Sequence, residues 1–173
     1  MPRLHASDLT TMGKCMMMWA FRKVDGIITP ASPSMIVGTG THKSVATNLK
    51  YKRDEGEEIP LDHAQDAARD ATKEEIESGG IYLVGDEKKE EKKIVAGAID
   101  SAVNLATAHH KSIAPGIDPK RIEESFVVDV KGHDIQLAGT IDVQQQNGNI
   151  NDLKTTKKTP GKGTADESIQ MTM

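Results

Sequence analysis

The chain has 173 residues, of which 36% are hydrophobic, 28% charged and 3% aromatic. These values predict a single soluble globular domain, and no apolar run is long enough to cross a bilayer, so we expect no membrane partner. The formal net charge of −4 gives no general attraction to phosphate. A nucleic-acid partner would therefore have to be held by local basic patches.

The start of the chain and its cysteine content bear on location. The first residues, "MPRLHASDLTTMGKC", lack the basic-then-apolar pattern of a secretory signal. Cys15 is the single cysteine, so no internal disulfide can form, which is typical of a reducing compartment. We therefore expect a cytoplasmic protein.

Helical patterns fill the first two thirds of the chain. Residues 7–23 begin with Ser-Asp, a good helix N-cap, and the two prolines of 25–34 end that helix. A second helix is expected from near Thr41 to 56. A third spans 60–80, with proline near its start and two glycines at its end, and the longest covers 86–111.

The pattern then changes from helical to alternating. In residues 124–143, Phe126, Val128 and Val130 alternate with polar neighbours, which predicts half-buried strands. A further strand follows, and a last helix is expected to start near Asp166. Helices followed by a three-stranded antiparallel meander and a C-terminal helix predict an α+β fold.

The segment "GTIDVQQQNGNINDLKTTKK", residues 139–158, reads as a β-hairpin. A two-residue Asn-Gly turn would pair Val143 with Asp152 and leave Asp142 on the other face. A three-residue loop, 146–148, with Gly148 left-handed in a bulge, would instead pair Asp142 with Asp152. Glycine stands where that bulge needs it, so we predict the three-residue loop.

Two facing carboxylates repel each other unless a cation lies between them. A hard divalent ion such as Mg²⁺ suits Asp142 and Asp152, and Lys154 follows on the same face, where it could stabilise a phosphate. These parts match metal-assisted phosphodiester hydrolysis. The alternative interpretation is an exposed hairpin whose Asp and Lys form a surface salt bridge.

Five segments resemble motifs of the PD-(D/E)XK nuclease superfamily, in particular its RecB-type exonuclease branch from phages and bacteria. They are "SDLTTMGKCMMMWAFR", "GTGTHKSV", "IEESFVVDVKGHDIQLAGTID", "NGNINDLKTTKK" and "DESIQMTM". Their order is that of the family, and together they span nearly the whole chain. The resemblance implies a restriction-endonuclease-like core with N-terminal helices and a truncated C-terminal helix, in one domain over 1–173.

The resemblance also implies roles for particular residues. His42, at the start of a helix, Asp142 and Asp152 would be metal ligands together with the backbone carbonyl of Leu153, Lys154 would be the catalytic lysine and Gln170 a site residue. Glu123 or Glu124 would lie near the metal. Because imidazole is a softer ligand than carboxylate, His42 moves the preference from Mg²⁺ toward Mn²⁺.

The chain departs from the family in two ways. The family's tyrosine would follow Met173, so we expect that the last helix is incomplete. Some relatives bind an iron–sulfur cluster through one early and three late cysteines, but Cys15 has no partners, so we expect no cluster in this chain.

The expected activity is that of a metal-dependent deoxyribonuclease, most simply an exonuclease, in DNA recombination, repair or processing. Lys157, Lys158 and Lys162 follow Lys154 and form a basic patch that could track a phosphate backbone; the alternative is a solvated loop. The competing function is a nuclease-fold module that binds DNA or protein without cutting. A recombination or repair partner protein and a homo-oligomer stay open. Gly38-Thr39-Gly40 lacks the ending of a phosphate loop, so no nucleotide site is assigned to it.

Overall fold

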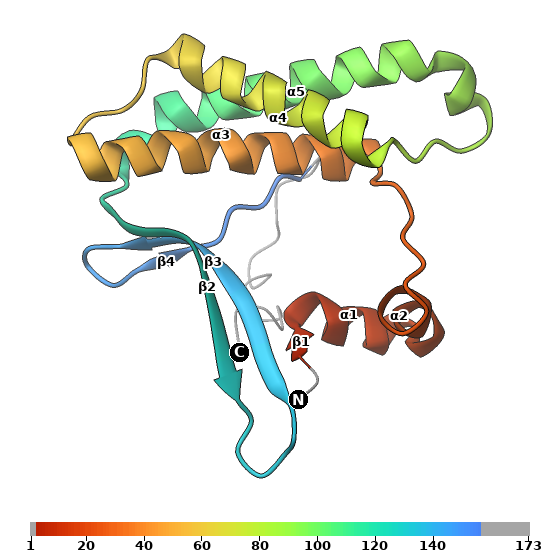
Figure 1. Ribbon diagram of the computed structural model, residues 1–173. Coiled ribbons are helices and arrows are strands. Elements are labelled where there is room, and N and C mark those ends of the chain that lie inside the picture. The colour runs from red at the N-terminus through yellow and green to blue at the C-terminus, as the bar shows by residue number, and fades with distance from the viewer. Residues whose placement is uncertain (1–2, 157–173) are drawn as a thin grey trace. The chain divides into compact units, whose positions relative to one another are not determined.

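The computed structural model describes residues 3–156, and in this part of the chain it is an α+β protein with five α-helices and a mixed sheet. Its elements are β1 (Arg3–His5), α1 (Ala6–Lys14), α2 (Met16–Lys23), α3 (Pro33–Glu55), α4 (Leu61–Gly79), a 3₁₀ helix (Gly85–Glu90), α5 (Glu91–Ser112), a second 3₁₀ helix (Ala114–Gly116), β2 (Pro119–Asp129), β3 (Gln136–Gln145) and β4 (Ile150–Asn151) (Figure 1). None of the described helices combines the length and the apolar character needed to span a membrane.

The chain divides into two compact units, which are described separately. The first contains the described residues 3–28, 124–141 and 156, and the second contains Thr29–Glu123 and Asp142–Thr155. Strands β2 and β3 therefore each contribute to both units. The single domain expected from the chain length stays a prediction.

A parallel edge strand distinguishes the first unit from the expected meander. β1 pairs in parallel with β3, with Leu4 opposite Leu137 and His5 opposite Ala138. β2 lies on the other side of β3, and β4 pairs with β3 in antiparallel fashion. The meander of β2, β3 and β4 is thus present within a mixed sheet. The sequence did not predict β1, because three residues are too short to show an alternating pattern.

The predicted helix 7–23 is in fact two short helices. Cys15 separates them with an extended backbone (φ −163°, ψ 106°). The Asp8 carboxylate accepts a hydrogen bond from the His5 amide at 2.9 Å and pairs with Lys23 at 3.2 Å. Asp8 therefore both caps α1 and links it to α2.

The second unit is built on three packed helices, α3, α4 and α5 (Figure 1). α3 begins at Pro33 rather than near Thr41, because Ser32 caps it through a 3.4 Å bond from the Met35 amide and proline suits the first helical position. It ends at Gly56, whose φ of 83° is the left-handed conformation of a helix C-terminus. α4 agrees with the predicted third helix. The predicted longest helix is a 3₁₀ turn followed by α5.

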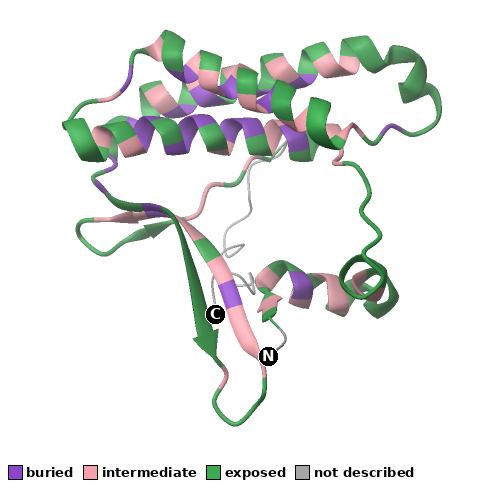
Figure 2. Cartoon of the chain, in the orientation of Figure 1, coloured by how far each residue is buried: buried purple, intermediate pink, exposed green. Residues whose placement is uncertain are grey.

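Small side chains bring the three helices close together, and the buried residues in Figure 2 gather where they face one another. Ala68 of α4 and Ala102 of α5 are fully buried. At Gly40 of α3, an added Cβ would overlap the hydroxyl oxygen of Thr72 and lie 3.1 Å from the Ala68 carbonyl oxygen. Glycine is therefore required at this crossing of α3 and α4.

Replacing Gly40 by alanine should lower the free energy of unfolding by about 1–3 kcal/mol, because the added methyl overpacks the helix interface. Gly97→Ala is the matched control, because Gly97 lies in α5 with nothing within 4 Å of the added Cβ. Alanine has a greater helix propensity than glycine, so this variant should raise the free energy of unfolding by up to about 1 kcal/mol. Urea unfolding measures both. Equal changes for the two variants would contradict the packing of α3 on α4.

His109 of α5 makes stability depend on pH. It is 5% exposed, and burial lowers the pKa of its imidazole below the ordinary 6.5, with His110 acting in the same direction and Glu58 opposing it. The unfolded chain therefore takes up this proton at higher pH than the folded one. The free energy of unfolding should decrease as the pH falls below about 6.5.

His109→Gln removes that proton uptake, so its stability should depend less on pH between 7 and 5 than that of the native chain. Thermal unfolding across this range measures the difference. An unchanged pH dependence in the variant would show that His109 does not contribute to it.

Candidate functional site

The β3–β4 hairpin has the register predicted from its sequence. Val143 pairs with Asn151 and Gln144 with Ile150, and the Gln145 amide donates to the Asn149 carbonyl at 2.8 Å. Residues 146–148 therefore form a three-residue loop, and the φ of Gly148 is 88°, the left-handed conformation expected of the bulge. The two-residue turn is wrong. One further step in this register sets Asp142 opposite Asp152.

A hydrogen bond from a backbone amide to a side-chain carboxylate joins the two arms beyond β4. The Leu153 amide donates to the Asp142 carboxylate at 2.7 Å. Leu153 also packs against the apolar core cluster, which includes Leu49 and Val143. The carboxylate of Asp142 is thus oriented by a main-chain donor that is itself fixed on the core.

His42 comes to Asp142 from α3. It lies well inside this helix rather than at its start, which corrects the expected position, since α3 begins at Pro33. Its Nδ1 lies 3.8 Å from the Asp142 carboxylate, and the two side chains are 33% and 22% exposed. The two residues that the resemblance names as ligands of one metal therefore lie close together, and their role as ligands stays a prediction.

A small cavity of about 20 Å³ lies at this meeting point, large enough for one water-sized particle. Its polar lining comes from His42, Glu123 and Asp142, and Leu153 also lines it. The remaining lining residues are apolar: Val45, Ala46, Ile122 and Val143. All four belong to the buried core cluster, so the cavity is set against a packed wall.

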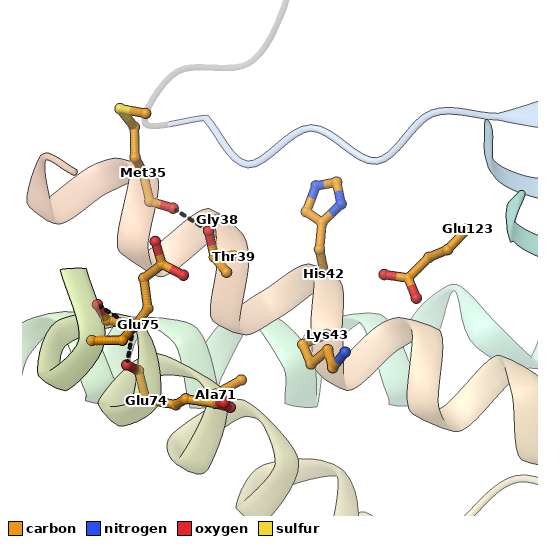
Figure 3. Close-up of a pocket in the computed structure, with 10 residues that line it drawn as sticks. Met35, Gly38, Thr39, His42, Lys43, Ala71, Glu74, Glu75 and Glu123 are labelled. Atoms are coloured by element: carbon orange, nitrogen blue, oxygen red, sulfur yellow. Dashed lines mark hydrogen bonds between the residues drawn. The ribbon is translucent and has the colours of Figure 1, made fainter. Parts of the chain in front are cut away.

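Glu123 is held in an unusual backbone conformation. Its φ of 53° is the only positive value at a non-glycine residue in the described chain, and such strain persists only where surrounding contacts enforce it. Its carboxylate pairs with Lys50 of α3 at 2.6 Å. Figure 3 shows Glu123 directed toward the side of α3 that carries His42. The resemblance implied that either Glu123 or Glu124 would lie near the metal. Nothing in the sequence indicated the positive φ at Glu123.

Asp152 and Lys154 form an ion pair. The lysine Nζ lies 2.9 and 3.0 Å from the two carboxylate oxygens of Asp152. The Asp152 side chain is 9% exposed and that of Lys154 is 55% exposed. The alternative interpretation from the sequence, an Asp–Lys salt bridge, thus describes the contact correctly, although its acidic partner is largely buried.

Two glycines bring α3 against its neighbours. An added Cβ at Gly38 would lie 3.2 Å from the Thr155 hydroxyl oxygen, just beyond Lys154 in the chain, and Gly40 meets α4 as described above. The Gly-Thr-Gly sequence thus permits close packing on both sides of α3. Sequence reasoning missed this role, because close approach between segments distant in the chain leaves no local pattern.

The donors around the small cavity suit a hard divalent ion in type. His42 offers an imidazole and Asp142 and Glu123 offer carboxylates, the groups that Mg²⁺ and Mn²⁺ accept. Within residues 3–156, however, no three His, Cys, Asp or Glu side chains stand together as a ready-made metal site. Asp152 is engaged by Lys154 and is not among the residues that line the cavity. The residues at the cavity therefore fit a divalent ion in the type of their donor atoms, and Asp142 and His42 are the two donors that lie closest together.

A larger groove of about 690 Å³ adjoins this cavity and shares His42 and Glu123 with it (Figure 3). It runs between α3 and α4. The predicted residues Gln170, Lys157, Lys158 and Lys162 lie outside the described part of the chain.

Comparisons with protein-family models, with curated proteins and with solved structures find no match to this chain.

The hairpin register can be tested at its loop. Gly148→Ala should lower the free energy of unfolding by about 1 kcal/mol or more, because alanine is strained at a φ of 88°. Gln146→Ala, at an exposed position of the same loop, should change it by less than about 0.5 kcal/mol. Chemical denaturation distinguishes the two, and equal effects would contradict the left-handed bulge.

Proposed function

We propose that this chain is a metal-dependent DNA nuclease domain of the PD-(D/E)XK superfamily, of the RecB exonuclease type, acting in DNA recombination, repair or processing. The observation that carries the proposal is the three-residue loop of the β3–β4 hairpin. In the register it sets, the Asp142 carboxylate meets His42 at a cavity of the size of one ion or water. The motif resemblance supplies the reaction class.

The first part of the proposed mechanism is the holding of a cation. His42 and Asp142 would ligate Mg²⁺ or Mn²⁺, with Asp152 and the Leu153 carbonyl completing the set that the resemblance implies. A divalent ion at these donors supplies activation of water and polarisation of the scissile phosphodiester. The Leu153 amide fixes the orientation of the Asp142 carboxylate.

The second part concerns Lys154. Its ammonium group extends to solvent while the buried carboxylate of Asp152 holds it in place. A lysine is a point charge that binds phosphate oxygens. In the proposed mechanism, Lys154 stabilises the negative charge that develops on the attacked phosphate. Asp152 then positions Lys154, and ligation of the cation is the further task that the resemblance implies for it.

DNA is the proposed partner in spite of the acidic total charge. Lys157, Lys158 and Lys162 follow the site in the sequence and would contact the phosphate backbone. A partner protein and a homo-oligomer are consistent with the proposal but rest on the resemblance alone.

A second candidate function is a nuclease-fold module that binds DNA or protein without cutting it. One observation favours it: the Asp152 carboxylate is occupied by Lys154. The two functions differ in whether the site takes a divalent ion.

Asp152→Asn tests the catalytic proposal. The substitution keeps the size of the side chain but removes the charge, so Mg²⁺-dependent degradation of linear DNA should fall by at least about a hundredfold. Asp100→Asn, at an exposed position of α5, is the matched control and should keep full activity. Release of acid-soluble nucleotides, with and without EDTA, is the measurement. Undiminished cleavage by Asp152→Asn would refute the proposed role of this residue.

Asp142→Asn tests whether a cation is bound at all. Calorimetry with Mn²⁺ should show binding to the native chain that weakens at least about tenfold in the variant, because a charged oxygen ligand is lost. Asp100→Asn should bind as the native chain does. Absence of Mn²⁺ binding to the native chain would favour the non-cutting module.

A further inference from the structure

The groove between α3 and α4 is lined by a lysine, by carboxylates and hydroxyls, and by an apolar methionine. α3 contributes Met35, Gly38, Thr39, His42 and Lys43, and α4 contributes Ala71, Glu74, Glu75 and Ser78. On α3 these positions follow a three-and-four spacing, so they form one continuous face of the helix. At about 690 Å³ the groove is within the range of small-molecule sites.

The end of the groove near the small cavity carries one lysine. His42 lines both spaces, and Lys43, the next residue of α3, lines the groove with its side chain directed away from that of His42 (Figure 3). Glu123, which also lines both, has its charge offset by Lys50 at 2.6 Å. Lys43 is therefore the group at this end that can bind an anionic group such as a phosphate.

The middle of the groove is rich in hydrogen-bond acceptors. Figure 3 shows Glu75 directed from α4 toward Thr39 of α3. The hydroxyl hydrogens of Thr39 and Ser78 are already donated to backbone carbonyls of their own helices, at 3.3 and 2.7 Å. Both hydroxyls are left with acceptor capacity only, like the carboxylates of Glu74 and Glu75.

These charges decide how a ligand can lie. A phosphate chain cannot run along the groove, because Glu74 and Glu75 would repel it. A ligand with a phosphate near Lys43 and an amine near Glu75 meets favourable groups at both ends. The exposed Met35 at the far end offers an apolar thioether, which contacts aromatic rings favourably.

We propose that the α3–α4 groove binds one nucleotide whose base carries an exocyclic amino group. The phosphate lies at Lys43, and the base donates its amine to Glu75. This inference rests on the proposed function, because the bound nucleotide would be the terminal one of the DNA strand presented to the site. It is not a phosphate loop: α3 contributes side chains rather than a helix N-terminus.

A groove whose side chains only accept hydrogen bonds should bind cytosine more tightly than uracil. Cytosine presents an amino group where uracil presents a carbonyl oxygen, and a carboxylate pairs with the former and repels the latter. The mononucleotides dCMP and dUMP differ in the base at this position and are therefore matched probes. Titration of each into the full chain in EDTA, followed by amide chemical shifts of Gly38, Thr39 and Ala71, measures binding without metal or cleavage.

The native chain should bind dCMP about tenfold more tightly than dUMP, as expected for one charge-assisted hydrogen bond. Glu75→Gln should bring the ratio near one, because an amide both donates and accepts. Glu77→Gln is the control on the same helix: Glu77 is exposed and does not line the groove, so the ratio should be kept. Lys43→Ala should weaken both ligands to a similar extent.

Equal binding of dCMP and dUMP by the native chain, or binding of neither, would overturn the inference without reference to any variant. A ratio that Glu75→Gln leaves unchanged would overturn it as well. These outcomes are separate from those of the proposed function. If Asp152→Asn leaves cleavage intact, the catalytic assignment fails while the nucleotide ratio can stand; if Asp152→Asn abolishes cleavage and the ratio is one, only the groove inference fails.

Discussion

The hydrogen bond from the Leu153 amide to the Asp142 carboxylate is the contact on which the site depends. It joins the two arms of the β3–β4 hairpin after the ladder itself has ended. Without it, an acidic side chain between Ile141 and Val143 would bear the cost of partial burial with little compensation. With it, the carboxylate is turned toward His42 and the small cavity. A requirement of folding and a requirement of the proposed ion binding are thus met by the same main-chain donor.

α3 is the platform for this arrangement. Its inner face packs on α4 and α5 through small residues, and its glycines let neighbouring segments approach closely. His42 and Lys50 on the same helix reach Asp142 and Glu123. Because the helix is anchored by fully buried Ile36 and Leu49, the side chains that it presents to the site have a rigid base. Rigid elements hold a binding geometry better than loops do.

The local parts of this picture could be read from the sequence. Glycine at 148 sufficed to choose the three-residue loop, because a left-handed bulge demands it, and the register followed. α4 was predicted from its proline and glycines. Such features depend on a few adjacent residues whose backbone preferences are strong.

The features that depend on contacts between distant residues could not be predicted from the sequence. The break at Cys15, the parallel strand β1 and the strained backbone of Glu123 have no local signature. The engagement of Asp152 by Lys154 was weighed only as an alternative, because spacing shows that two side chains share a face but not whether they pair with each other or with a ligand. The roles of Gly38 and Gly40 appear only once Thr155 and Thr72 are brought against α3.

The central claim is that the cavity between His42 and Asp142 holds a divalent cation. Anomalous diffraction from crystals soaked in Mn²⁺ tests it most directly, because the signal locates the ion without assuming any activity. The account predicts a peak in contact with the Asp142 carboxylate and the His42 imidazole. A strong peak elsewhere on the chain, with none between these two residues, would contradict it.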